Sequence, residues 1–294
     1  MKSLQEILAI ARSVGWGASY LLRSYYHGDF KGGSLEIQNK LDGPVTAADI
    51  AVNRYILDRL QTNVGNQDFA YVSEETYTSQ STEQLSHSWV WIIDPLDGTR
   101  DFIERTGEYA VHIALVNSGR PVLAVVAWPE AEKLYYATIG GGTFVETRDG
   151  THTPLRVSGR NAMEDMTLVV SRTHRDQRFN ALLQQLPFRN QHHVGSIGCK
   201  IATIVEQRAD VYISLSGKSA PKDWDLAAPE LILTEAGGQF THFDCTPLKY
   251  NQADVNQWGG LLASNGHCHA CLCSQAERIL AEIDGANSGF INNS

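Results

Sequence analysis

An apolar run that ends in two carboxylates restricts how this chain can fold more than any other feature. Residues 91–99 read Trp-Ile-Ile-Asp-Pro-Leu-Asp-Gly-Thr, so Asp94 and Asp97 follow a segment that is apolar on both faces of a strand. Such a run predicts a buried strand. Two carboxylates at its exit are costly to bury unless a cation neutralises them. The sequence therefore predicts oxygen ligands for a metal ion at the end of this strand.

The residues after the strand favour an anion beside that metal. Gly98 and Thr99 stand next to an expected helix start, where unpaired backbone N–H groups can bind a phosphate. Arg100 is the one basic residue close in sequence that could form an ordinary ion pair with the two aspartates. Hard divalent ions such as Mg²⁺ prefer oxygen ligands. The combination indicates chemistry on a phosphate ester with Mg²⁺ as cofactor.

Composition limits the partners. The chain has 294 residues, 43% of them hydrophobic, and a net charge of −9. A nucleic-acid polymer is not an expected partner, because no basic excess is available to replace its counterions. A membrane span is not expected either, since no run of 18 or more apolar residues occurs. The start of the chain does not resemble a signal peptide, and the five cysteines are typical of reduced intracellular thiols, so we expect a cytoplasmic protein.

Hydrophobic periodicity divides the chain into two parts. The first part is expected to be α+β, with helices at 4–24 and 46–60, a mobile glycine-rich loop at 28–43, strands at 69–73 and 89–93, and an antiparallel meander at 111–116, 122–128 and 134–138. The second part alternates, with strands at 167–171, 211–215 and 260–263 and helices at 175–186, 197–207, 224–236 and 267–283. This predicts an N-terminal α+β subdomain, 1–158, that carries the metal site and a C-terminal α/β subdomain, 159–294, that carries substrate-binding segments, with a cleft between them.

Other acidic residues each have an ordinary structural explanation. Asp49 follows Thr46 at the spacing of a capping box at a helix start. Glu74 and Glu75 end a strand and could be solvated there. Asp225 could cap the helix that begins near Trp224. Taken singly, these residues do not establish a metal site.

Their order along the chain is more specific. A Thr-x-x-Asp helix start, a strand-terminal Glu-Glu pair, Asp-Pro-Leu-Asp-Gly-Thr and Trp-Asp-x-Ala-Ala-Pro follow one another between about Lys40 and Gly266. This order resembles the lithium-sensitive, Mg²⁺-dependent phosphatase superfamily that includes inositol monophosphatase, fructose-1,6-bisphosphatase and 3'(2'),5'-bisphosphate nucleotidase. The resemblance implies a layered αβαβα sandwich. It also implies two or three Mg²⁺ ions and attack on phosphorus by water, without a covalent phosphoenzyme.

The resemblance also assigns roles to residues of this chain. The metal ligands it implies are Glu74, Asp94, the carbonyl of Leu96, Asp97 and Asp225. The residues implied in orienting and deprotonating the attacking water are Asp49, Thr99 and Glu74. The residues implied in contacts with substrate are Glu74, Leu96, Asp97, Gly98, Thr99, Ser196, Lys200 and Asp225.

Local detail is similar to the bisphosphate nucleotidase branch of this superfamily. The central motif continues Arg-Asp-Phe where that branch typically reads Lys-Glu-Phe, and residues 195–200 read Gly-Ser-Ile-Gly-Cys-Lys. Lys200 can supply the positive charge that a second phosphate needs, although a solvated lysine at a helix start explains it equally well. Arg172 and His174 are further candidates for substrate contacts.

The expected reaction is the hydrolysis of 3'-phosphoadenosine 5'-phosphate, and possibly 3'-phosphoadenosine 5'-phosphosulfate, to remove the 3'-phosphate. The expected partner is thus a small phosphorylated nucleotide, and the protein a monomer or homodimer. The alternative is a phosphatase for inositol 1-phosphate or fructose 1,6-bisphosphate.

A different class of function concerns the segment His-Cys-His-Ala-Cys-Leu-Cys at 267–273. Closely spaced cysteine and histidine could bind zinc or another soft metal and make the chain a metal-responsive regulator. The competing interpretation is the first turns of a terminal helix, with the thiols as small core or surface residues. Neighbouring helix positions point in different directions, which favours the second interpretation.

Overall fold

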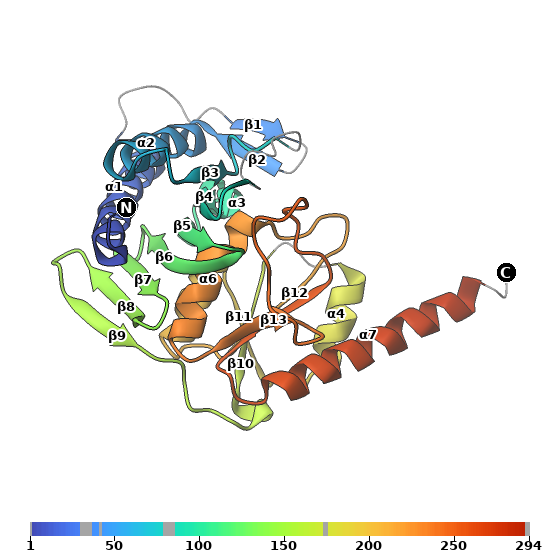
Figure 1. The fold of residues 1–294 in the computed structure, drawn as a ribbon. Helices are drawn as coiled ribbons and strands as arrows, with labels where there is room; N and C mark the ends of the chain where they lie inside the picture. The colour runs from blue at the N-terminus through green and yellow to red at the C-terminus, as the bar shows by residue number, and fades with distance from the viewer. Residues whose placement is uncertain (1, 30–36, 41–42, 79–85, 173–175, 292–294) are drawn as a thin grey trace.

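The computed structural model describes residues 2–29, 37–40, 43–78, 86–172 and 176–291. Two β-sheets and the helices between and outside them are stacked in layers (Figure 1). The helices are α1 (Leu4–His27), α2 (Ala47–Val64), α3 (Thr99–Ile103), α4 (Gln177–Gln185), α5 (Ile197–Val205), α6 (Asp223–Glu235) and α7 (His269–Ile291), with a 3-10 turn, η2, at Met163–Asp165.

The larger sheet has seven strands in sequence order. They are β3 (Ala70–Ser73), β4 (Trp89–Asp97), β5 (Ala110–Asn117), β6 (Arg120–Trp128), β7 (Lys133–Thr138), β8 (Gly142–Thr147) and β9 (His152–Leu155). The β3–β4 pair is parallel and every following pair is antiparallel. The predicted meander is therefore confirmed, and it continues through two further hairpins.

The smaller sheet is mixed and has the order β11-β10-β12-β14-β13. Its strands are β10 (Thr167–Val170), β11 (Asn190–His193), β12 (Val211–Leu215), β13 (Gln239–His242) and β14 (Gly260–Ser264). Strand β10 pairs in parallel with β11 and β12, whereas β14 pairs antiparallel with β12 and β13. A separate hairpin joins β1 (Ile37–Lys40) to β2 (Gly43–Thr46).

Three hydrophobic cores separate the layers. One packs α1 and α2 on a face of the larger sheet, through side chains such as Trp91 and Ile93. A second fills the space between the sheets with α5 and α6, and it includes Ile92 from the larger sheet and Tyr212 from the smaller. The third packs α4 and α7 on the outer face of the smaller sheet. This confirms the predicted αβαβα sandwich, while the division at residue 158 stays a prediction because the central core joins residues from both sides of it.

The sequence prediction missed several short strands. The expected loop at 28–43 is wrong for Ile37–Lys40, which form β1, and residues 30–36 and 41–42 lie outside the described residues. Strand β11 is entirely exposed and polar, so it carries no apolar alternation. Pairing with a neighbouring strand, rather than side-chain burial, defines such strands, and this pairing is not visible in local sequence.

Candidate active site

A β-bulge directs both aspartates of the central motif to the same side of the sheet. In the pairing of β4 with β5, Asp94 lies opposite His112 and Asp97 opposite Ala110, so β4 has one extra residue over this stretch. Residues three apart on a regular strand point to opposite faces, and the bulge removes that difference. Leu96 instead packs in the core beneath α1 and α2. Both carboxylates therefore face the central layer, where α6 begins.

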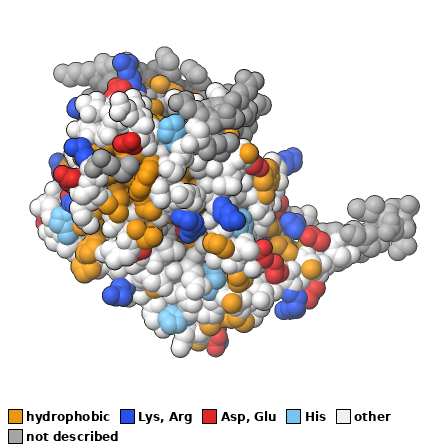
Figure 2. All heavy atoms as spheres, viewed as in Figure 1, with side chains coloured by type: hydrophobic (Ala, Val, Ile, Leu, Met, Phe, Trp, Pro, Cys, Tyr) orange, Lys and Arg blue, Asp and Glu red, His pale blue; other side chains and the backbone are white. Residues whose placement is uncertain are grey.

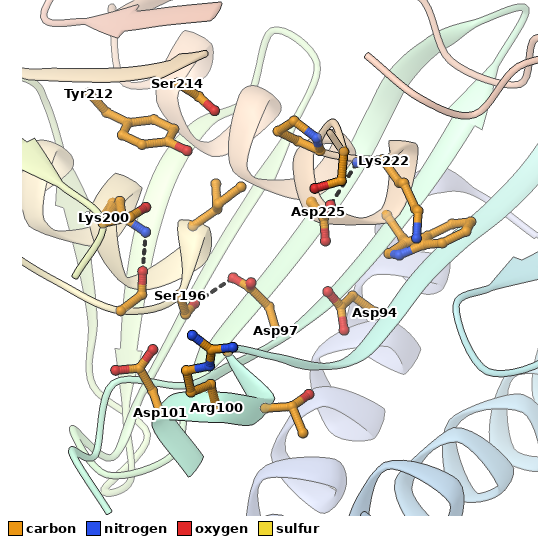
Figure 3. Close-up of a pocket in the computed structure, with 18 of the residues that line it drawn as sticks. Asp94, Asp97, Arg100, Asp101, Ser196, Lys200, Tyr212, Ser214, Lys222 and Asp225 are labelled. Carbon is orange, nitrogen blue, oxygen red and sulfur yellow. Dashed lines mark hydrogen bonds between the residues drawn. The ribbon is translucent and has the colours of Figure 1, made fainter. Parts of the chain in front are cut away.

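Asp225 joins them from the first turn of α6. One carboxylate oxygen of Asp94, one of Asp97 and one of Asp225 all lie within 4.8 Å of one another, and Figure 3 shows the three side chains directed toward a common space. Asp225 also accepts a hydrogen bond from the Lys222 backbone N–H at 2.6 Å. The capping interpretation and the ligand interpretation of Asp225 are thus both compatible with its position.

The electrostatics of the cluster are unfavourable without a cation. Burial, with the neighbouring charge of Asp225, raises the pKa of Glu74 to about 8. Burial, with the charge of Asp97, raises the pKa of Asp225 to about 6. The pKa of Asp94 is raised well above its ordinary value by burial and then by Glu74. Carboxylates that resist ionisation in this way form the donor set that a hard divalent ion stabilises, so the residues present fit a magnesium site.

Asp97 differs from the other acidic residues of the cluster because three polar groups surround its Oδ2 atom. Its Oδ2 accepts the Ser196 hydroxyl at 2.5 Å and the Gly198 backbone N–H at 3.0 Å, and the His112 ring lies 3.2 Å away. Burial alone would raise the pKa of Asp97, but His112, then Ser196, outweigh it and leave the pKa at about 2. Asp97 is therefore an ionised carboxylate held in one orientation.

The position of Asp49 is compatible with both of its expected roles, the capping of α2 and the contact with Thr99. Its Oδ2 accepts the backbone N–H and the hydroxyl of Thr46, at 2.7 and 2.6 Å, which completes the capping box of α2. Its Oδ1 lies 3.2 Å from the hydroxyl oxygen of Thr99. That oxygen is equally far from the Leu96 carbonyl oxygen. Burial raises the pKa of Asp49 to about 6, partly offset by Thr46.

A cavity of about 290 Å³ opens over the acidic cluster. Glu74 and all the residues from Asp94 to Asp101 except Pro95 line one wall, and parts of the smaller sheet and of α5 and α6 line the other. Among the predicted residues, the cavity brings together Glu74, Asp94, Leu96, Asp97, Gly98, Thr99, Arg172, Ser196, Lys200 and Asp225. Asp49 stands behind Thr99, and His174 lies outside the described residues.

The basic residues of the cavity are held in different ways. Lys200 is only 2% exposed, donates to the carbonyl of Gly195, and has its ammonium 5.4 Å from the centre of the Tyr212 ring. Burial lowers its pKa, although the charge of Asp97 opposes this. Arg172 donates to Glu108 through two nitrogens, at 3.0 and 2.6 Å, and Glu108 also accepts the Gly195 N–H. Arg172 thus sits at the cavity wall in an ion pair.

The sequence prediction missed His112 and Tyr212. Both lie on strands whose other residues are mostly apolar, so their side chains resembled ordinary core positions. His112 contacts Asp97, and Tyr212 lines the cavity beside Lys200. The strand-pairing partner of Asp94 could have identified His112, but register is not visible in a single sequence.

The histidine and cysteine side chains that the structure describes in segment 267–273 are not grouped closely enough to hold a metal ion. Among the described residues, the group of histidine, cysteine or acidic side chains close enough to hold an ion is the aspartate cluster. His269 bonds to Ser264 and Thr241, and Cys273 is buried in the core under α7. The interpretation as a terminal helix is therefore confirmed. Across the described part of the chain, no helix has both the length and the apolar character needed to cross a bilayer.

Comparison with known proteins gives a consistent result. The inositol monophosphatase family matches residues 3–281. A protein named 3'(2'),5'-bisphosphate nucleotidase CysQ from Aggregatibacter actinomycetemcomitans is 31% identical over 252 residues, which are 85% of this chain and 88% of that protein. The protein of the same name from Salmonella typhimurium is 36% identical over 211 residues, or 71% of this chain and 80% of the relative.

Solved structures share the fold. An inositol monophosphatase from Anabaena superposes with a TM-score of 0.74 at 25% identity and covers 94% of this chain and 97% of its own. CysQ from Bacteroides thetaiotaomicron, described as a bacterial member of the inositol monophosphatase family, has a TM-score of 0.70 at 23% identity and covers 90% of this chain and 98% of its own. These likenesses agree with the resemblance that the motif order indicates.

Proposed function

Since the chain belongs to the inositol monophosphatase family, we propose that it is a Mg²⁺-dependent phosphatase that removes the 3'-phosphate of 3'-phosphoadenosine 5'-phosphate, leaving AMP. The observation that carries this proposal is the convergence of Asp94, Asp97 and Asp225 at one end of a cavity that also contains the buried cation of Lys200. The names of the relatives support the choice of substrate.

Glu74, Asp94, Asp97, Asp225 and the Leu96 carbonyl would hold two or three Mg²⁺ ions. When bound, these ions polarise the phosphoryl oxygens and lower the pKa of a coordinated water. Asp97 is ionised and fixed in advance by Ser196 and Gly198. Asp94 is fixed by the Leu96 N–H, which it accepts at 2.9 Å. The chain therefore orients these two carboxylates through hydrogen bonds of its own.

Thr99 and Asp49 would orient the attacking water. When the Thr99 hydroxyl donates to Asp49 Oδ1, its lone pairs remain free to accept a proton of a water in the cavity. The distance of 3.2 Å is within the reach expected for proton transfer along such a pair. Glu74, with its pKa raised to about 8 by burial and Asp225, lines the same cavity and would contact the water as well.

The second phosphate of the substrate would lie toward Lys200. The strip from the aspartate cluster through Ser196 to Lys200 crosses the cavity (Figure 3), and Gly98 and Thr99 would contact the phosphate that reacts. Charged side chains of both signs are interspersed on the face that Figure 2 shows. That distribution and the net charge of −9 support a small phosphorylated molecule as substrate rather than a polyanion.

A comparison of substrates tests the proposal. We expect kcat/KM with Mg²⁺ to be highest for 3'-phosphoadenosine 5'-phosphate, with 3'-phosphoadenosine 5'-phosphosulfate also hydrolysed. Inositol 1-phosphate and fructose 1,6-bisphosphate should be hydrolysed more slowly, because each lacks the second phosphate at the distance set by a nucleotide. Phosphate release in a steady-state assay measures all four rates. A preference for inositol 1-phosphate would replace the proposed activity with that of the inositol phosphatases.

Magnesium should raise the melting temperature more at pH 8 than at pH 5. In the metal-free fold, burial and neighbouring charge raise the pKa of Glu74 from 4.5 to about 8 and that of Asp225 from 3.8 to about 6. The folded chain therefore binds more protons than the unfolded chain between about pH 4 and 8, and its stability falls as the pH rises through that window. Mg²⁺ favours the ionised carboxylates and offsets the loss.

Differential scanning calorimetry with and without Mg²⁺ at the two pH values checks this. The same magnesium-induced shift at pH 5 and pH 8 would contradict the expected linkage. NaCl of matched ionic strength serves as the control for general ionic effects and screening.

A further inference from the structure

His112 contacts Asp97 and the backbone carbonyl of Trp224, the residue before Asp225. It stands on β5 opposite Asp94 and is fully buried. Its Nε2 atom is 3.2 Å from Asp97 Oδ2, and its Nδ1 atom is 3.2 Å from the carbonyl oxygen of Trp224. Among the described residues, Nε2 has no hydrogen-bond partner of good geometry, and the Asp97 carboxylate is the charged group beside it.

The surrounding backbone is shaped to admit this ring. A Cβ atom on Gly198 would lie 2.3 Å from His112 Nε2 and 2.9 Å from a methyl carbon of Val126. Real Cβ atoms do not approach that closely, so glycine at this position of α5 makes room for the imidazole. Gly198 also donates its N–H to the same Asp97 oxygen. The ring is therefore enclosed by β5, α5 and α6.

The two contacts of the ring link ligands from different elements. Asp97 ends β4, whereas the Trp224 carbonyl belongs to the peptide bond that leads into Asp225 on α6. A ring protonated on Nε2 donates to Asp97, and a ring protonated on both nitrogens donates to both groups. We infer that His112 is a positioning residue that holds Asp97 and the first turn of α6 at the separation needed to bind the metal ion.

This inference rests on the proposed metal-dependent function, and its test measures the metal itself. Substitution of a residue that orients a metal ligand typically weakens metal binding about 10- to 100-fold. Two variants of similar size separate positioning from packing. His112→Gln keeps an N–H donor near the position of Nε2, and His112→Leu fills similar space without any donor.

The Mg²⁺ dissociation constant is measured by isothermal titration calorimetry without substrate, on the wild type and both variants. We expect about 10- to 100-fold weaker binding in His112→Leu and a loss of no more than about threefold in His112→Gln. Equal affinity in wild type and His112→Leu overturns the inference, as does an equal loss in the two variants. If the wild type itself does not bind Mg²⁺, the proposed function fails, which is a separate result.

A second measurement does not depend on whether His112→Leu folds. In a ¹⁵N-labelled sample, two-dimensional ¹H–¹⁵N correlation of the imidazole rings identifies the protonated nitrogens, and the spectrum of His112→Gln assigns His112 among the ten histidines. We expect both ring nitrogens of His112 to be protonated, because each faces an acceptor oxygen, with protons that exchange slowly because the ring is buried. An unprotonated Nε2, both with and without Mg²⁺, overturns the inference.

Discussion

The variant Asp94→Asn is expected to lose nearly all turnover while becoming more stable without metal. Asp94 is 1% exposed, and one of its oxygens lies within 4.8 Å of oxygens of both Asp97 and Asp225. The amide keeps the shape of the side chain but lacks the negative charge that the ions require. Bound metal supplies several kcal/mol of transition-state stabilisation, so a fall in kcat of at least about 10³-fold is expected.

The gain in stability follows from the same repulsion that raises the pKa values. Burial and the charge of Glu74 hold the pKa of Asp94 well above its ordinary value, so ionising it destabilises the metal-free fold near neutral pH. Asparagine removes this cost. The melting temperature of the metal-free variant should therefore exceed that of the wild type, and Mg²⁺ should raise it little.

Asp210→Asn is the matched control. Asp210 is also fully buried, but it bonds to Ser158, Arg160 and the Thr167 N–H and does not line the cavity. Its loss leaves the partly exposed Arg160 guanidinium without its carboxylate partner and removes the acceptor of the Ser158 hydroxyl, so the fold should be destabilised while kcat at saturating Mg²⁺ is retained. A near-normal kcat in Asp94→Asn at saturating Mg²⁺ would refute the role of Asp94 in holding the ions.

The layered fold could be predicted because its determinants are local. Apolar runs separated by turn residues define β5, β6 and β7, and helical spacing defines α1 and α2, which cover one face of the larger sheet. The polar edge strand β11 could not be predicted, because its side chains bury nothing and only its pairing with β10 makes it a strand.

The same distinction between local and long-range determinants applies to the candidate site. Asp94 and Asp97 stand out because carboxylates end an apolar strand. Asp49 does not, since its capping of α2 explains the residue completely until the contact with Thr99 is seen. The contact of His112 with Asp97 depends on the register of β5 against a bulged β4 and on a glycine in α5. No local sequence pattern predicts a contact between residues of different elements such as this one, so the tertiary structure is needed to identify it.

Lys200→Met is expected to change substrate preference rather than metal binding. Lys200 is the buried cation across the cavity from the aspartate cluster, and methionine preserves most of its packing against Tyr212. A hydrogen bond to a charged group contributes about 1.5–3 kcal/mol. At about 1.4 kcal/mol for each factor of ten, kcat/KM for 3'-phosphoadenosine 5'-phosphate should fall roughly 10- to 150-fold.

Inositol 1-phosphate, which has a single phosphate, should lose much less. The ratio of the two kcat/KM values is the informative quantity, because any general disturbance from the unpaired Gly195 carbonyl affects both substrates alike. Lys133→Met is the control, since Lys133 pairs with Glu206 at 2.6 Å and does not line the cavity. It should leave the ratio unchanged. Equal losses on both substrates in Lys200→Met would mean that Lys200 supports the fold of the cavity and does not recognise a second phosphate.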